Sequence, residues 1–136
     1  MLCAGVVHGD LSEFNILLAH ADKDGSADGV DVPVIIDLPQ AIDAAGNNHA
    51  QRMLLRDVGN LRHFFGQFAP VLLATHYGPE IWSLYQAGTL TNETPLTGHY
   101  ERKRADVDMQ AVLREIDDAR AEDAARRLRM ATTSAL

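Results

Sequence analysis

The chain has 136 residues, of which 46% are hydrophobic and 23% charged, and this balance suffices for one ordinary globular core. A formal net charge of −7 argues against sequence-independent binding of nucleic acid, because neutralising phosphates requires clustered Lys and Arg. No apolar run reaches the roughly 18 residues that span a bilayer, and the N-terminus lacks the pattern of a signal peptide. We therefore expect a cytoplasmic protein without a membrane partner, and its single cysteine, Cys3, excludes an internal disulfide.

The first part of the chain predicts short strands around polar loops. Short apolar runs occupy residues 6–7, 16–18 and 32–36, and Gly, Asp and Pro residues bound them. Residues 21–31 are rich in turn formers. The runs at 16–18 and 32–36 are therefore expected to pair as a hairpin across a long polar loop.

Helical spacing follows. Between residues 49 and 68 a broad apolar stripe predicts the core helix. Another helix is expected to begin near residue 77, with Pro79 at its first helical position, and to stop at Gly88.

Residues 104–130 predict one long charged helix, so we divide the chain into residues 1–100 and a helical segment, 101–136. The helix either covers the core of its own domain or extends to meet a partner. Its thin apolar stripe consists of Met109, Leu113, Ile116, Ala124 and Leu128.

The stretch HGDLSEFN, residues 8–15, places Asp10 and Asn15 on a loop between two of the apolar runs. An Asp there can accept the proton of an attacking hydroxyl, while the Asn binds a metal ion that bridges the phosphates of a nucleotide. A second metal ligand should come from the end of a nearby strand, where Asp37 stands. Mg²⁺ prefers oxygen ligands and keeps several waters, so Asn15 and Asp37 suffice. The alternative is a turn in which Asp10 and Asn15 only cap backbone groups.

HGDLSEFN is followed by IIDLPQ at residues 35–40, RDVGN at 56–60 and the pair Phe64-Phe65. Together these stretches resemble the RIO family of atypical serine/threonine protein kinases. Ordinary protein kinases carry HRD and DFG instead, and aminoglycoside and choline kinases lack Ser12-Glu13 and the Pro-Gln that follows IIDL. The resemblance runs from about residue 6 to residue 68.

This resemblance implies an α+β fold, mainly α: a protein-kinase-like C-lobe in which a small β-hairpin carries the catalytic and metal-binding loops beside a helical bundle. It implies ATP-dependent phosphoryl transfer with Mg²⁺, in which Asp10 is the catalytic base and Asn15 and Asp37 are the metal ligands. Asp37 is also implied as a phosphoryl acceptor, which would allow ATPase-like turnover. Ser12 and Glu13 are cofactor-binding candidates: Ser12 lies near the phosphates or bonds the loop backbone, and Glu13 holds the loop.

Other residues near these motifs are expected to support the loop. His8 should have a structural role, with hydrogen bonds to backbone groups, rather than act as an acid or base. Arg56 and Asp57 either tie the helix at 49–68 to the loop through a buried ion pair or lie on a solvated helix face.

The chain begins a few residues before the catalytic loop, so we expect the N-lobe to be missing or separately encoded. Phosphoryl transfer depends on groups from both lobes, so the polypeptide by itself is expected to be a poor kinase or none. Its partners would be ATP and a protein substrate, or the chain itself in autophosphorylation. Two alternatives stay open: a small-molecule phosphotransferase of the aminoglycoside or choline kinase type, and a non-catalytic kinase-like module that binds a partner through the helix at 104–130.

Overall fold

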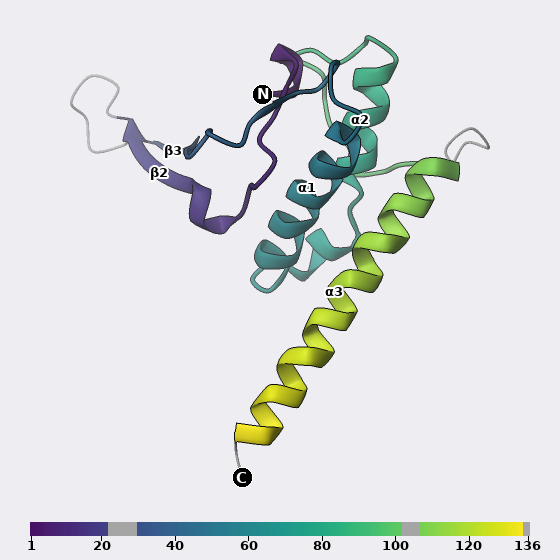
Figure 1. Ribbon diagram of the computed structural model, residues 1–136. Coiled ribbons are helices and arrows are strands. Elements are labelled where there is room, and N and C mark those ends of the chain that lie inside the picture. The colour runs from purple at the N-terminus through teal and green to yellow at the C-terminus, as the bar shows by residue number, and fades with distance from the viewer. Residues whose placement is uncertain (22–29, 102–106, 135–136) are drawn as a thin grey trace. The chain divides into compact units, whose positions relative to one another are not determined.

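The computed structural model describes residues 1–21, 30–101 and 107–134 (Figure 1). The chain divides into two compact units, Met1–Tyr100 and Glu101–Leu136. Helices predominate, and two small antiparallel sheets accompany them, which agrees with the expected α+β class. Among the residues described, none of the helices combines the length and the apolar character that crossing a membrane requires.

Two pairs of antiparallel strands lie in the first unit. The strands are β1 Val6–Val7, β2 Ile16–Ala21, β3 Val30–Ile35 and β4 Ile42–Asp43. β1 pairs with β4, and β2 pairs with β3 in a register that places Ile16 opposite Ile35. The predicted hairpin is therefore confirmed, although residues 22–29 of its loop lie outside the described residues. β4 was not predicted, because Ile42-Asp43 forms neither an apolar run like Val6-Val7 nor a stretch long enough to show alternation.

Apolar side chains line the β2–β3 hairpin, and most of them are exposed. Leu17 and Leu18 on β2 are 53% and 71% exposed, and Val32 and Val34 on β3 are 44% and 41% exposed. The two strands form a sheet of their own. Backbone pairing, rather than burial in a core, therefore holds the hairpin together.

Helix α1 (Ala50–Gly66) is the centre of the first unit and confirms the predicted core helix. It contacts β1, the 3₁₀ helices η2 (Glu13–Asn15) and η3 (Pro70–Ala74), and helix α2 (Tyr77–Gln86). Gly78 in the first turn of α2 is buried, and a Cβ atom added to it would lie 3.2 Å from Leu55 Cδ2. The missing side chain at Gly78 thus lets the two helices approach closely.

The ends of α2 differ in how well they follow the prediction. The helix begins at Tyr77, so Pro79 is its third residue and not its first. This placement costs no hydrogen bond, because the first four N–H groups of a helix have no partner within it. Gly88 ends the helix as predicted: its φ is +71°, and its N–H donates to the carbonyl of Tyr85 at 3.0 Å.

Short 3₁₀ helices complete the first unit: η1 Leu2–Ala4, η2 Glu13–Asn15 and η3 Pro70–Ala74. Periodicity does not predict them, because segments of three to five residues are too short to show a helical period.

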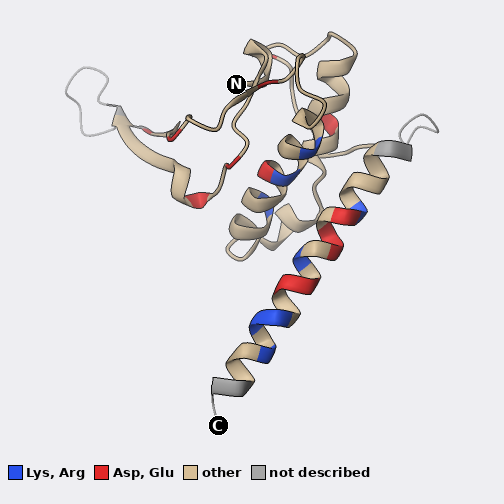
Figure 2. Cartoon of the chain, viewed as in Figure 1, with Lys and Arg blue, Asp and Glu red and all other residues tan. Residues whose placement is uncertain are grey.

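The described part of the second unit is one long helix, α3 (Val107–Ser134). We expected a helix over residues 104–130; residues 104–106 lie outside the described residues, and the helix continues past Met130 to Ser134. Charged side chains of both signs follow one another along α3 (Figure 2).

A carboxylate attaches the segment after α2 to the first turn of that helix. Glu80 is 9% exposed and accepts hydrogen bonds from Thr97 N (2.7 Å), Thr97 Oγ1 (2.9 Å) and Gly98 N (2.8 Å). Burial by itself would raise the pKa of Glu80, but these hydrogen bonds and the nearby His99 lower the pKa overall. The ionised form therefore holds the segment in place.

We expect Glu80→Gln to lower the free energy of unfolding by about 1–3 kcal/mol at neutral pH, because an amide cannot accept all three hydrogen bonds. The pKa of Glu80 lies below its ordinary value of 4.5 in the folded state. Its stabilisation is thus present above that value and is lost as the pH falls through the lowered pKa. Urea unfolding at neutral and acidic pH should show the gap between wild type and variant shrinking in acid.

The control for this prediction is Glu93→Gln, which changes an exposed glutamate in the loop after α2. This substitution should lower the free energy of unfolding by less than about 0.5 kcal/mol. If the difference in free energy of unfolding between wild type and Glu80→Gln were equally large in acid, the ionised carboxylate would not be what holds the segment.

Candidate functional site

The HGDLSEFN loop follows β1 and turns at Gly9. Gly9 has a φ of +87°, and a Cβ atom added to it would lie 2.9 Å from the backbone oxygen of Gln40. Other residues rarely adopt such a φ, and a backbone oxygen cannot move aside as the end of a flexible side chain can. The glycine therefore lets the loop pass directly beside the IIDLPQ segment.

His8 links the same two motifs from a buried position. Its side chain is 3% exposed, Nδ1 faces the backbone N–H of Asp10 at 3.2 Å, and Nε2 faces the carbonyl of Ile36 at 2.9 Å. An imidazole that accepts at Nδ1 and donates at Nε2 satisfies both contacts. The expected structural role of His8 is confirmed.

Ile36 is held at both of its backbone groups by this loop. Its N–H donates to the carbonyl of Asn15 at 2.9 Å, and its carbonyl accepts the hydrogen bond from His8. Asp37 follows immediately in the chain. The structure thus joins the strand end that carries Asp37 to both ends of the loop that carries Asp10.

Helix α1 holds the loop through a buried carboxylate. Asp57 is 1% exposed and accepts hydrogen bonds from Gly9 N at 2.9 Å and Leu11 N at 3.1 Å. Burial raises the pKa of Asp57, although these two hydrogen bonds and the nearby charge of Arg56 act to lower it. The residues on either side of Asp10 are thereby fixed to the helix, while Asp10 itself is exposed.

Two more side chains of α1 bind carbonyl groups of the same loop. Arg56 Nη2 donates to the oxygen of Gly9 at 2.5 Å, and Asn60 Nδ2 donates to that of Leu11 at 3.4 Å. The expected tie between helix and loop is therefore present, but hydrogen bonds to the loop backbone form it in place of a buried ion pair. Neighbouring helical residues such as Arg56 and Asp57 do not face each other, so each finds its own backbone partner.

Ser12 and Asn15 close the loop around η2. Asn15 Oδ1 accepts hydrogen bonds from Ser12 N at 3.0 Å and from Ser12 Oγ at 3.1 Å, and Ser12 Oγ accepts one from Phe14 N at 3.3 Å. Ser12 thus bonds the loop backbone, and Glu13 occupies the first turn of η2. Binding of Mg²⁺ by Asn15 stays a prediction, and it would replace one of the hydrogen bonds from Ser12.

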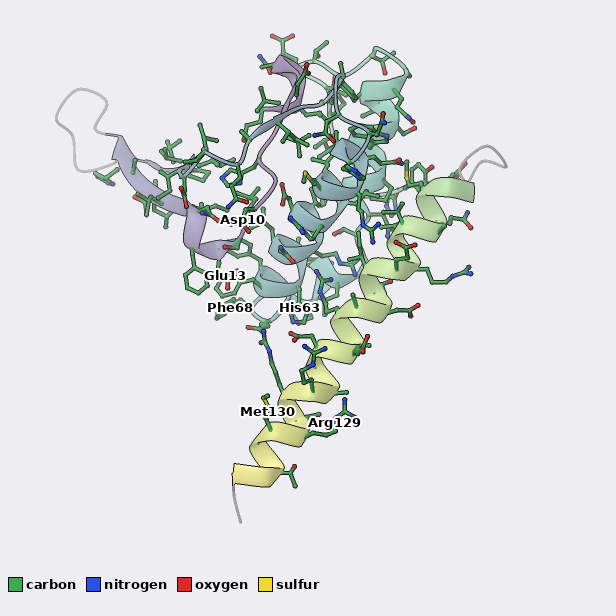
Figure 3. All side chains as sticks on the ribbon, viewed as in Figure 1. Asp10, Glu13, His63, Phe68, Arg129 and Met130 are labelled. Atoms are coloured by element: carbon green, nitrogen blue, oxygen red, sulfur yellow. The ribbon has the colours of Figure 1, made fainter. Side chains whose placement is uncertain are left out.

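Asp10 and Asp37 both present exposed carboxylates. Figure 3 shows Asp10 and Glu13 along the segment that connects β1 to β2. Asp37 has a φ of +65°, a left-handed conformation that Asp tolerates better than most residues. One carboxylate and one amide suit Mg²⁺, which retains water ligands. Within the described ranges, no group of three or more His, Cys, Asp or Glu side chains is placed to hold a metal ion.

The sequence left the role of the helix residues that hold the loop open for Arg56 and Asp57 and indicated no role for Asn60. Arg56, Asp57 and Asn60 all lie in the RDVGN stretch. Their spacing of three and four residues places Asn60 beside the other two on the helix surface, which is the signal for a common partner. The same spacing fits a solvated helix face, so only the structure identifies the partner as the loop.

Comparisons with known proteins agree with these motifs. The sequence model of the RIO domain matches residues 1–77, which include the loop and the helix residues that hold it. Over 64 residues, 47% of this chain, the sequence is 38% identical to a probable serine/threonine-protein kinase RIO1 homolog of Encephalitozoon cuniculi (strain GB-M1). The match spans 14% of that protein.

A solved structure is also similar to this chain. It is the crystal structure of the Rio2 kinase–ADP/Mg²⁺–phosphoaspartate complex from Chaetomium thermophilum, with a TM-score of 0.39 and 22% sequence identity. The similarity covers 88% of this chain and 35% of that one. The chain thus spans well under half the length of either relative.

Replacing Asp57 with asparagine should lower the free energy of unfolding by about 1–3 kcal/mol, because an amide cannot accept hydrogen bonds from both Gly9 and Leu11. Urea unfolding measures this cost. Asp118→Asn makes the same chemical change at an exposed helical position and should cost less than about 0.5 kcal/mol. Equal costs in the two variants would contradict the role of Asp57 in holding the loop.

Proposed function

This chain belongs to the RIO domain family, and on that basis we propose that it takes part in ATP-dependent phosphoryl transfer as a serine/threonine kinase. One observation carries the proposal: both backbone groups of Ile36 bind the loop, through His8 and Asn15. This supports a site in which Asp37 and Asp10 act on the same nucleotide. In the alternative, Asp10 and Asn15 would only cap backbone groups of their own turn. Such a turn would not need hydrogen bonds to Ile36, the residue before Asp37.

In the proposed reaction Asp10 is the general base. Its carboxylate is exposed, and the backbone around it is fixed through Gly9, Leu11 and His8. Such a carboxylate can accept the proton of a serine or threonine hydroxyl from a protein substrate without moving the loop. The substrate is another protein or the chain itself.

Asn15 and Asp37 are the residues that would hold Mg²⁺ beside the phosphates, with Ser12 and Glu13 supporting the loop between Asp10 and Asn15. Mg²⁺ in this position would offset the negative charge that develops as the terminal phosphoryl group moves. Asp37 presents an exposed carboxylate for this purpose. The amide oxygen of Asn15 would exchange a hydrogen bond from Ser12 for the metal ion.

Asp37 is also proposed as a phosphoryl acceptor, on the strength of the family resemblance. The bond between the terminal phosphorus and the bridging oxygen of ATP breaks, ADP leaves, and the carboxylate oxygen forms an acyl phosphate. Water then hydrolyses this acyl phosphate. Hydroxylamine, which cleaves acyl phosphates and leaves phosphoserine intact, distinguishes this product from a phosphorylated hydroxyl group.

The first test is ATP binding by the 136-residue chain, measured by calorimetry with and without Mg²⁺. Binding should require Mg²⁺ and should be lost in Asp37→Asn, because the amide lacks the charge that attracts the ion. Asparagine also tolerates a positive φ, so this variant tests the carboxylate and not the backbone.

The matched control is Asp31→Asn, which removes an exposed carboxylate from β3 and should leave ATP binding unchanged. Binding that is equally strong without Mg²⁺, or that survives in Asp37→Asn, would contradict the proposed role of Asp37.

The second test joins the chain to the N-lobe of a RIO kinase, which would supply the groups that cover the phosphates. The fusion should transfer labelled phosphate to protein, and Asp10→Ala should reduce the rate by at least about 100-fold, the usual effect of losing a general base. Asp37→Asn should abolish transfer, and Asp31→Ala should not. Transfer to an aminoglycoside or choline in place of protein would favour the small-molecule alternative, and a fusion active without Asp10 would refute the mechanism.

A further inference from the structure

The amide oxygen of Asn15, the proposed metal ligand, already accepts two hydrogen bonds. Ser12 N donates to Asn15 Oδ1 at 3.0 Å, and Ser12 Oγ donates to it at 3.1 Å. An amide oxygen has two lone pairs, so these donors use its whole accepting capacity. The side chain is also buried, since Asn15 is 8% exposed. A cation that binds Oδ1 must therefore take the place of one of the two donors.

The backbone donor is the harder of the two to displace. The carbonyl of Ser12 accepts a hydrogen bond from Asn15 N at 3.0 Å, and the N–H of the preceding residue, Leu11, donates to Asp57 Oδ1 at 3.1 Å. Moving the N–H of Ser12 away from Asn15 would disturb both contacts. The hydroxyl group, in contrast, turns about a single bond without any change in the backbone. The hydroxyl of Ser12 is thus the donor that yields.

The oxygen of this hydroxyl stays in place when its hydrogen turns. Ser12 Oγ also accepts a hydrogen bond from Phe14 N at 3.3 Å, and that contact does not involve the hydroxyl hydrogen. After turning, the O–H group needs a new acceptor. Water molecules on a divalent cation direct their lone pairs at the ion and are poor acceptors, whereas phosphate oxygens are charged and strong acceptors. The hydroxyl therefore gains a full replacement partner only where a nucleotide accompanies the metal ion.

We propose that the hydroxyl of Ser12 makes this site selective for a metal–nucleotide complex over the free divalent cation. Without a nucleotide, the hydroxyl holds Oδ1 against the cation, because yielding costs the hydrogen bond to Asn15. With a nucleotide, the hydroxyl exchanges that bond for one to a phosphate oxygen, and the cost disappears. Ser12 acts through Asn15 and is a positioning residue. This inference rests on the proposed function, since it takes Asn15 as a metal ligand.

A simple helix cap would behave in the opposite way. Ser12 is the N-cap of η2, which begins with a capping box between Ser12 and Asn15. If the hydroxyl only held Asn15 in position, removing it would let that side chain move and would weaken the binding of a free cation. If the hydroxyl competes with the cation, removing it strengthens the binding, because Ser12 N still holds the amide oxygen. The direction of the change thus separates the two roles.

The test measures the binding of Mn²⁺, a paramagnetic substitute for Mg²⁺, to the full chain without nucleotide. Electron paramagnetic resonance counts the free ion during a titration. Ser12→Ala should bind Mn²⁺ about 2- to 10-fold more tightly than the wild type, which corresponds to the usual net contribution of one hydrogen bond. Ser12→Gly removes the same hydroxyl, and glycine is accepted at N-caps at little cost, so it replaces Ser12→Ala if that variant does not fold.

Calorimetry then measures the binding of the Mn²⁺ complex of a non-hydrolysable ATP analogue. Neither variant should bind this complex more tightly than the wild type, so the preference for the complex over the free ion falls about 2- to 10-fold. Ser12→Thr is the matched control and should behave like the wild type. It keeps the hydroxyl, and the extended backbone at this position, with φ −149° and ψ 179°, suits a β-branched residue. Ser83→Ala removes a hydroxyl from α2 and should change neither affinity.

Two results would overturn the role of Ser12 and leave the proposed function standing. In the first, the wild type binds Mn²⁺ and Ser12→Ala binds it equally or less tightly, as expected for a simple cap. In the second, the variants bind the free ion and the complex more tightly by the same factor, so the hydroxyl does not distinguish them. Absence of Mn²⁺ binding from every variant, with and without the nucleotide, would instead refute the metal site, and with it both this inference and the proposed function.

Discussion

The candidate site depends on the hydrogen bonds that the buried carboxylate of Asp57 accepts from the loop backbone. A buried charge is unfavourable unless hydrogen bonds compensate for it, and here the compensating donors are the backbone N–H groups of Gly9 and Leu11. These are the two neighbours of Asp10. The requirement to satisfy a buried carboxylate therefore fixes the backbone on both sides of the proposed base and leaves the base itself facing solvent.

A continuous series of contacts leads from this anchor to the proposed metal ligands. His8 connects the loop to the carbonyl of Ile36, and Asn15 binds the N–H of the same residue. Asp37 comes next in the chain, so its position depends on the loop, and the position of the loop depends on α1. Chemistry that needs two oxygen-bearing side chains beside the same phosphates is thus supported by one helix, although the side chains come from separate motifs.

The sequence predicted elements whose signal lies in their own periodicity. The β2–β3 hairpin and α1 are long enough to show alternation or an apolar stripe, and both were found where expected. Pro79 was predicted as the first residue of its helix and is the third, because the first turn tolerates proline at several positions. The partner of Asp57 and the hydrogen bonds of Asn15 could not be predicted, because both depend on which backbone groups the fold brings within reach. Residue type and spacing alone do not determine that.

The exposed β2–β3 hairpin has a consequence for the behaviour of the chain in water. Among the described residues, each of its strands pairs only with the other, so the outer edges of this two-stranded sheet lie next to exposed apolar side chains such as Leu18 and Val34. An edge of this kind is a template for the addition of strands from other molecules. Leu17-Leu18 and the valines of β3 carry no charge that would oppose such growth, whereas Asp31, an exposed charge on β3, and Pro33, which lacks a backbone N–H, limit it. Salting-out ions such as sulfate strengthen apolar contacts, so the hairpin makes the chain prone to precipitate where such salts are abundant.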